Sequence, residues 1–519
     1  MATGLKDRRA SLRGGAGAFA SIHGGDLVAG ITVALVLVPQ SLAYAQLAGM
    51  PSHRGLYAAA LPPIVAALLA SSPYLQTGPV AITSLLTFGA LSTLAPIGSD
   101  EYVALGLLLA LVVGATRLVI GLARGGVIAY LMSQPVLVGF TSGAAILIVC
   151  SQLPTLLGVD APDDGVLERA AYALAHVGSW DWTAIVLGAA TLATMRLGPL
   201  VHPLFPAVLV AAVGAIVFSR ATGYDGVTVG AIPADPPPFS LDFAWSSFPS
   251  LVVPGVVIAI VGFAEPAAIA RTFAAAERRP WDSNRELVSQ GTANVAAAFS
   301  GGFPVGGSFS RSALNRIAGA RTRWSGAVTG LAVLAFLPFA SSMSPLPRAV
   351  LAAIVIGAVV GLVAVVPLAR LARLSPAQFV VATATLVLTL ALSPHVERAL
   401  VAGVVLAVAL HLRRELQLEV ISWTEDETLH LRPRGVLWFG TSERLEKAVL
   451  ALVAAHPAAK SLAVHLDGLG RIDVTGALAL RALLQDARAA GLDVQIVDVR
   501  PRWRGLVERV IERVDDPLG

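Results

Sequence analysis

Residues 301–315 read Gly-Gly-Phe-Pro-Val-Gly-Gly-Ser-Phe-Ser-Arg-Ser-Ala-Leu-Asn, and this stretch decides the fold that we expect. It lies between long apolar segments, but its four glycines and Pro304 cannot continue an ordinary membrane helix. Irregular backbone at membrane depth is tolerated only where it is buried in protein or lines a polar cavity. Ser308 can cap a short helix that runs to about Ile317. The stretch therefore predicts a broken membrane segment whose half-helix begins inside the protein.

Arg311 lies in the first turn of this predicted half-helix. The N-terminus of a helix carries free N–H groups and roughly half a positive charge. An arginine in the membrane adds a full charge at a considerable cost, which suggests a function. The combination predicts an anion site at mid-membrane. The alternative is a kinked helix whose arginine extends to the lipid surface.

The composition is that of a polytopic membrane protein. Of 519 residues, 55% are hydrophobic and 13% are charged, far below the roughly 25% charged residues of soluble domains. Arginines gather in one set of loops, so the net charge of +4 indicates orientation in a lipid bilayer and not nucleic-acid binding. The single cysteine excludes an intrachain disulfide, and the nine histidines lack metal-ligand spacing. We expect no cofactor, no metal and no enzymatic activity.

A second interrupted segment begins at Thr77-Gly78-Pro79 and ends near Pro96. Proline is favoured at a helix start, and the segment is shorter than the roughly 20 residues that a bilayer core requires. When the apolar segments are counted, this one is third of the first seven, and the glycine-rich stretch is third of the second seven. Broken segments at matching positions of inverted repeats are the best sequence indication of a transporter's binding site.

The chain divides into four expected parts: a cytoplasmic N-terminal arm at 1–25, transmembrane repeats at 26–222 and 245–412, and a cytoplasmic α/β domain at 425–519. Placing the N-terminus inside puts most loop arginines on the cytoplasmic side and two acidic loops outside. From about residue 425, strand and helix signals alternate. We predict strands at 428–431, 435–439, 461–466 and 494–499. We also predict three helices: one that Ser442 caps, one that Thr475 caps and one that covers residues 502–514.

Two long motifs resemble the signatures of the sulfate permease family, the bacterial and plant branch of solute carrier family 26. The first comprises Pro39-Gln40-Ser41-Leu42-Ala43-Tyr44-Ala45, Ala48-Gly49-Met50-Pro51 and Gly55-Leu56-Tyr57. The second comprises Asn284-Arg-Glu-Leu287, Gln290-Gly291, Asn294, Gly301-Gly-Phe-Pro304 and Ser308-Phe-Ser-Arg-Ser312. Asp467 and residues 472–476 resemble the STAS domain that these proteins carry.

The resemblance implies a uracil-permease-like fold of fourteen segments in two inverted repeats, with core and gate domains and half-helices at segments 3 and 10. It also implies anion transport by an elevator-type motion in a homodimer, in the inner (cytoplasmic) membrane. In this family, the substrate lies between the N-termini of the third and tenth segments and is lined by the first. The matching positions here are Gln40, Tyr44, Val80, Ala81, Ser308, Phe309, Ser310 and Arg311.

Three of the polar residues have alternative interpretations. Gln40 can donate a hydrogen bond to an oxyanion, or it can satisfy backbone groups that Pro39 leaves free. Tyr44 lies one turn further on the same face and can form a wall of the site or only pack. Thr475 occupies the position that is phosphorylated in soluble STAS regulators, but we assign it a helix-capping role.

Glu265 lies in the eighth segment, where a buried carboxylate is costly. We assign it the role of proton-coupling residue, and the alternative is a structural partner for Arg311. An anion beside Arg311 would offset the positive charge and favour a protonated carboxyl group, so anion and proton binding should strengthen each other. Sodium-coupled bicarbonate relatives carry an aspartate here with a hydroxyl one turn later. This chain has Ile269 at that second position, which weakens the case for sodium.

These observations predict a secondary active anion transporter, coupled to protons, for sulfate, bicarbonate or a dicarboxylate. A sodium-coupled bicarbonate transporter and an uncoupled anion channel are alternatives within transport. A membrane-anchored signalling protein whose STAS domain is the active part is an alternative from another class. An anchor does not require two broken helices with Gln40, Glu265 and Arg311 inside the bilayer, so transport is favoured.

Overall fold

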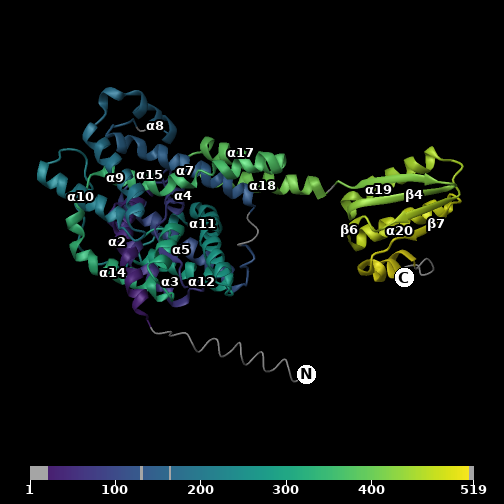
Figure 1. The fold of residues 1–519 in the computed structure, drawn as a ribbon, viewed down its shortest axis with the longest axis horizontal. Coiled ribbons are helices and arrows are strands. Elements are labelled where there is room, and N and C mark those ends of the chain that lie inside the picture. Colours follow the sequence, from purple (N-terminus) through teal and green to yellow (C-terminus); the bar gives the residue numbers. More distant parts are fainter. Residues whose placement is uncertain (1–21, 129–132, 163–164, 416, 513–519) are drawn as a thin grey trace, which may run out of the picture. The chain divides into compact units, whose positions relative to one another are not determined.

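The computed structural model describes residues 22–128, 133–162, 165–415 and 417–512 (Figure 1). It divides into two compact units. The membrane unit ends at Val404, and the C-terminal unit begins at Val405. Most of the expected N-terminal arm, residues 129–132 and 163–164 of the expected first repeat, and the end of the last expected helix lie outside the described residues.

The membrane unit is mostly helical. Its first half contains α2 (Gly24–Leu47), α3 (His53–Leu69), β1 (Gln76–Gly78), α4 (Ala81–Leu91), α5 (Asp100–Leu122), α7 (Gln134–Leu157), α8 (Val166–Ala175), α9 (Trp182–Val201) and α10 (Ala207–Thr222). Its second half contains α11 (Phe248–Ala276), α12 (Ser283–Phe299), β2 (Gly306–Ser308), α13 (Phe309–Ile317), α14 (Trp324–Phe336), α15 (Arg348–Val359), α16 (Val365–Leu374) and α17 (Pro376–Ala391). Helix α18 (Val396–Glu415) contains the boundary between the units.

Within the described residues, seven helical stretches are long and apolar enough to cross a membrane. They are Gly24–Leu47, Asp100–Leu122, Gln134–Leu157, Trp182–Val201, Trp245–Ala276, Trp324–Met343 and Arg348–Leu374. Helices α4, α10 and α17 are apolar but shorter. The polytopic helical fold is therefore confirmed, whereas the number of fourteen spans stays a prediction.

The helices pack in a pattern that repeats between the two halves. Helix α5 packs against α12 and α11, and α14 packs correspondingly against α3 and α2. Gly114 and Gly291 let α5 and α12 approach closely, since a Cβ on either glycine would lie within 3.0 Å of the other's carbonyl oxygen. Such matched pairs are what two repeats of seven segments require, and they support the expected symmetry.

The two interrupted segments meet in a short antiparallel pair of strands. Gln76 of β1 lies opposite Ser308 of β2, and Gly78 lies opposite Gly306. Helix α4 follows β1 and helix α13 follows β2, so the two half-helices begin at this pair and run in opposite directions. The glycines of both strands permit a close approach. A side chain at Gly307, for example, would collide with Leu75 and Pro266.

The C-terminal unit is a mixed sheet with helices. Its strands are β3 (Glu419–Glu425), β4 (Thr428–Leu437), β5 (Ser461–His465), β6 (Leu469–Ile472) and β7 (Asp493–Val497), and its two long helices are α19 (Phe439–Ala455) and α20 (Val474–Ala489). The strand order is β3-β4-β5-β7, with β6 also paired to β4. Strands β3 and β4 are antiparallel, whereas β5 pairs in parallel with β4 and β7. Leucines from the strands and from α20 form its buried core. The α/β class is confirmed.

Several local predictions for this unit are wrong. The strands expected at 428–431 and 435–439 form the single strand β4, whose register shifts at Gly435 when its partner changes from β5 to β6. Strands β3 and β6 were not expected. Helix α19 begins at Phe439, before Ser442. Asp473, not Thr475, caps α20 by accepting a hydrogen bond from the Gly476 N–H at 2.6 Å. The expected last helix is a series of short helical turns: Pro501–Trp503, Arg504–Leu506 and Val507–Glu512.

Candidate functional site

The starts of the two half-helices differ in how their N–H groups are satisfied. Ser308 precedes α13 in an extended conformation, and its Oγ accepts a hydrogen bond from the Arg311 N–H at 3.5 Å. The predicted cap is therefore confirmed. Val80 precedes α4 and has no side-chain acceptor, and Ala81 is the first helical residue. Uncapped N–H groups at a helix start are donors for an anion. Val80 and Ala81 are both buried.

Arg311 joins the start of α13 to the start of α4. It is 1% exposed, and its Nη2 donates to the Pro79 carbonyl oxygen at 2.8 Å. Its Nη1 donates to Gln40 Oε1 at 3.5 Å. The alternative in which the arginine extends to the lipid surface is therefore wrong. The Arg311 Nε–H is buried and has no hydrogen-bond partner among the described residues. Because unsatisfied buried donors are rare, this group needs an explanation, and an oxyanion would provide one.

Gln40 and Tyr44 lie one turn apart on α2 and are both buried. The Gln40 side chain contacts Arg311 and not the backbone around Pro39, so the alternative for Gln40 does not describe its contact in the structure. With its oxygen used by Arg311, its amide NH2 group remains a donor for a ligand. Tyr44 shares the face of Gln40. A wall of the anion site stays its predicted role.

Glu265 accepts a hydrogen bond from the half-helix, and its carboxylate also interacts electrostatically with Arg311. It is half-buried on α11, and its Oε1 accepts a hydrogen bond from the Phe309 N–H at 3.4 Å. That N–H is the first of α13 and is one of the groups that an anion at this helix start would use. Arg311 itself donates hydrogen bonds to Gln40 and Pro79. The carboxylate therefore lies where a substrate anion would compete with it.

The side chains of Phe309 and Ser310 are exposed, unlike those of their neighbours. Phe309 is 54% exposed and stacks on Phe273 of α11, and the Ser310 hydroxyl lies 3.3 Å from the Ser308 hydroxyl. The structure thus brings Gln40, Ser308, Arg311 and Glu265 together around one helix start that is open on one side. The assignment of these residues to anion binding stays a prediction.

Two side chains that the sequence analysis did not assign hold the glycine-rich break in place. Arg117 of α5 is fully buried and donates to the carbonyl oxygens of Ala259 and Val305, both at 3.0 Å. Asn294 of α12 accepts from the Val305 N–H at 2.9 Å and donates to its carbonyl at 3.0 Å. These bonds satisfy a backbone that forms neither helix nor long strand. An arginine in the middle of an apolar segment was the signal for Arg117.

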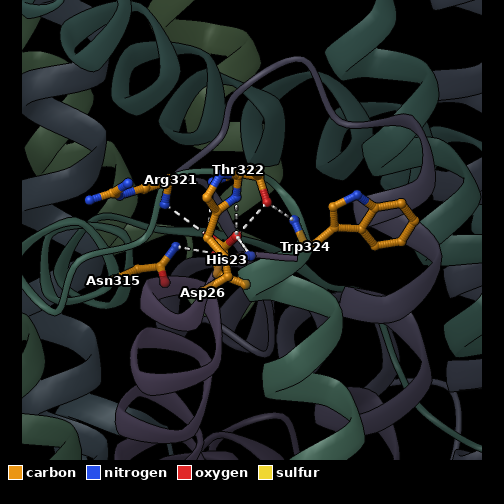
Figure 2. Close-up of polar contacts among 7 residues, drawn as sticks. His23, Asp26, Asn315, Arg321, Thr322 and Trp324 are labelled. Atoms are coloured by element: carbon orange, nitrogen blue, oxygen red, sulfur yellow. Dashed lines mark hydrogen bonds and ion pairs between the residues drawn. The ribbon is translucent and has the colours of Figure 1, made fainter. Parts of the chain in front are cut away.

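The far end of α13 is anchored to α2. Asp26 in the first turn of α2 is buried, and its carboxylate accepts hydrogen bonds from the N–H groups of Arg321 and Thr322 and from the Thr322 hydroxyl, each at 2.8 Å (Figure 2). Asn315 near the end of α13 donates to Ser325 Oγ of α14 at 2.8 Å. The half-helix that carries Arg311 is therefore fixed to the helix that carries Gln40.

Comparison with known proteins places this arrangement in a family. Residues 24–385 match the sulfate permease family, and residues 421–512 match the STAS domain. A probable sulfate transporter of Mycobacterium tuberculosis is 34% identical over 391 residues, which cover 74% of this chain and 69% of the relative. A sodium-independent sulfate anion transporter of Bos taurus is 30% identical over 514 residues, which cover 92% and 83%.

Two solved structures are similar in fold. Murine solute carrier 26 family member A9, an anion transporter in an inward-facing state, aligns with a TM-score of 0.85 at 19% identity over 94% of this chain and 88% of its own. The transmembrane domain of a cyanobacterial bicarbonate transporter aligns with a TM-score of 0.65 at 25% identity over 74% and 98%.

Proposed function

This chain belongs to the sulfate permease family, and from that premise we propose that it carries sulfate or a similar oxyanion across a membrane in symport with protons. The family consists of multi-pass anion transporters and not of enzymes, and the chain has the STAS domain that such transporters carry. The observation that carries the coupling is the contact between Glu265 and the Phe309 N–H at the start of α13.

The coupling follows from competition for one helix start. While Glu265 is ionised, its carboxylate neutralises the positive end of α13. A substrate anion at this position would meet a like charge nearby. Protonation of Glu265 removes that charge and frees the Phe309 N–H for the substrate. By linkage, the bound anion then favours the protonated carboxyl group by the same free energy.

Arg311 supplies the charge that does not titrate. A guanidinium stays protonated at physiological pH, so the site keeps one positive charge in all states. The loaded site with Arg311, the anion and a protonated Glu265 is closer to neutral than the same loaded site with an ionised Glu265. A complex with less net charge crosses an apolar barrier at a lower cost. This supports symport and not the movement of an anion by itself.

The environment of Ile269 argues against sodium coupling. Its side chain is 1% exposed and packs in a cluster with Tyr74 and Phe273, so it supplies no oxygen ligand one turn after Glu265. Sodium prefers oxygen ligands, as hard cations do. The similarity to a sodium-independent relative supports the same conclusion. Bicarbonate stays a candidate substrate, because the membrane unit shares its fold with a bicarbonate transporter.

We also propose an elevator-type motion in a homodimer, in the inner membrane with the STAS domain in the cytoplasm. Hydrogen bonds join α2, α11 and α13 around the site, while α7 packs against α15 and α17, and α9 against α15. The first group would move as the core domain against the second as the gate. In such a motion the residues of the anion site would keep their contacts with one another while the site crosses the membrane.

The test is uptake into liposomes that contain the purified protein. Labelled sulfate, bicarbonate and a dicarboxylate are offered under an inward proton gradient, an inward sodium gradient or neither. We expect concentrative sulfate uptake that requires the proton gradient and saturates. Uptake that follows only sodium would favour the sodium carrier, and uptake that never exceeds equilibrium would favour a channel. Absence of any anion flux would favour the signalling protein.

A further inference from the structure

A second cavity with a strong positive charge lies apart from the transport site. It has a volume of about 650 Å³ and is formed by the end of α3, the end of α11, the start of α12 and the segment between α13 and α14. This volume is within the range of small-molecule sites. Among the described residues that line it, none belongs to the predicted anion site.

Arginines dominate the charge of this cavity. Arg279, Arg285, Arg321 and Arg323 line it, and Glu277 is the single acidic residue among the described lining residues. The Glu277 carboxylate already has two cationic neighbours, with Arg279 Nε at 3.7 Å and Arg316 Nε at 3.5 Å. Among the described lining residues, four arginines therefore stand against one carboxylate, and the lining has a net positive charge.

The arginines are held on a fixed framework. Arg285 Nε donates to the Leu69 carbonyl oxygen at 2.9 Å, and Arg323 Nη1 donates to the Ala70 carbonyl oxygen at 3.2 Å. The backbone of Arg321 is fixed by Asp26, and its side chain points away from that cluster (Figure 2). A guanidinium has five N–H donors, so the bond from Arg285 Nε to one carbonyl oxygen leaves the Nη groups of that side chain as donors for a ligand.

We propose that this cavity binds the phosphate of an anionic phospholipid headgroup. Arginine matches the geometry of phosphate oxygens with two parallel hydrogen bonds. The cavity lies at the end of the unit where loop arginines gather, which is the side expected to face the cytoplasm. Basic pockets between membrane helices on that side are suited to lipid phosphate groups.

The remaining walls favour a lipid over a free phosphate ion. Leu68 and Leu69 line the cavity on the last turn of α3 and are 50% and 38% exposed. Trp281 and Trp324 also line it, and tryptophan is enriched at the level of lipid headgroups. Apolar and aromatic walls beside four arginines suit a ligand with a charged head and an apolar remainder. A free inorganic phosphate would not use these walls.

The experiment measures lipid binding to the purified full-length protein in detergent by native mass spectrometry. The probes are phosphatidylglycerol, zwitterionic phosphatidylcholine, and soluble glycerol phosphate and inorganic phosphate without acyl chains. We expect saturable binding of phosphatidylglycerol, weakened about fivefold by Arg321→Gln and by Arg279→Gln, since one basic residue contributes about that factor toward an anionic lipid. Both side chains are exposed, so neither change should unfold the protein, which thermal unfolding checks.

Arg373→Gln on α16 is the matched control, because Arg373 is exposed and lies outside the cavity. Unchanged binding in this control supports a specific site. An equal loss in the control would overturn the proposal in favour of a general attraction to positive charge. Retention of binding in both cavity variants would overturn it as well. Tight binding of glycerol phosphate or inorganic phosphate, equal to that of the lipid, would overturn the assignment to lipid. The measurement needs no transported anion, so its outcome is independent of the proposed transport function.

Discussion

The replacement Glu265→Gln tests the proposed coupling directly. It removes the negative charge that lies 3.4 Å from the Phe309 N–H but keeps the size of the side chain. The amide resembles the protonated carboxyl group, so the variant should behave as a transporter that always carries its proton. We expect it to bind the anion more tightly at neutral pH and to lose uphill, proton-driven uptake.

The size of the effect follows from the contact distance. A full charge and the half charge of a helix start, separated by the observed 3.4 Å, attract each other by about 2.4 kcal/mol at an effective dielectric constant of about 20. This free energy is an upper limit on what the anion regains when the carboxylate no longer occupies the helix start. It corresponds to an affinity up to about 60-fold higher at neutral pH.

Two measurements separate binding from coupling. Sulfate affinity is titrated between pH 5 and 8, and accumulation in liposomes is followed under an inward proton gradient. In the unmodified protein, affinity should rise as the pH falls and approach the affinity of Glu265→Gln, which should not change with pH. Glu397→Gln is the matched control, because Glu397 is another buried carboxylate of the membrane unit and lies 3.3 Å from His395, away from the half-helix starts. It should keep both the pH dependence and the uphill uptake.

If Glu265→Gln still concentrates sulfate when only a proton gradient is present, Glu265 is not the coupling residue. The same conclusion follows if the affinity of the variant depends on pH as that of the unmodified protein does, because another group would then bind the coupled proton. A variant that exchanges sulfate across the membrane but never concentrates it is the expected result. That combination would show an intact anion site without its coupling.

Three further predictions use the same structure. Arg311→Ala and Gln40→Ala should each weaken sulfate binding in the folded protein. The loss should be roughly tenfold or more for Arg311, because a charged hydrogen-bond donor is removed. Unchanged sulfate affinity in both variants would refute this site assignment. Deletion of residues 417–519 should change turnover, trafficking or dimer stability but leave sulfate affinity unaltered. A membrane unit that remains folded after the deletion but cannot bind the anion would contradict this prediction. The hydrogen bond from His465 Nδ1 at 2.6 Å lowers the pKa of Asp498, so Asp498→Asn should destabilise the C-terminal unit above pH 4. The difference in unfolding free energy between the variant and the unmodified protein should shrink as the pH falls through the lowered folded pKa. Urea unfolding at pH 7 and pH 3 measures this difference, and a value independent of pH would exclude the ionised carboxylate as its cause.

The broken segments could be predicted because their signals are local. Glycine and proline limit which backbone conformations residues 301–307 can adopt, and Ser308 has the chemistry of a cap, so the bounds of α13 match the prediction. The burial of Arg311 could be predicted because a charged side chain in the membrane is costly and therefore faces the interior of the protein. Each of these inferences needs only the residues within one turn.

The partners of these residues could not be predicted in the same way. Arg311 binds Pro79, which lies 232 positions away in the chain, and no periodicity of one segment gives the register between two segments. Gln40 and Glu265 were assigned to the site before their partners were known, and their contacts with Arg311 and with the Phe309 N–H depend on how α2 and α11 pack against α13. Long-range register is a property of the packed fold.

The errors in the C-terminal unit have a different cause. Asp473 and Thr475 are both good capping residues, and their intrinsic preferences differ too little to decide between them. In the structure, the Thr475 hydroxyl donates to the Asp473 carboxylate at 2.8 Å, so the two residues form one capping group. Strand β3 is at the end of the sheet order and pairs with β4. Its residues do not alternate regularly between buried and exposed positions, so the sequence pattern did not indicate a strand.

The proposed transport site combines one charge that is fixed with one that can be removed. Arg311 is buried, is held by Gln40 and Pro79, and keeps its proton, so it can attract an anion but cannot release it. Release therefore requires a competitor that gains charge after the anion has moved. Under the proposed coupling Glu265 would meet this requirement, because a carboxylate that loses its proton on the opposite side of the membrane would return to the Phe309 N–H and displace the substrate. The same contact would thus account for both tight loading at low pH and release at higher pH, and neither residue alone could provide both.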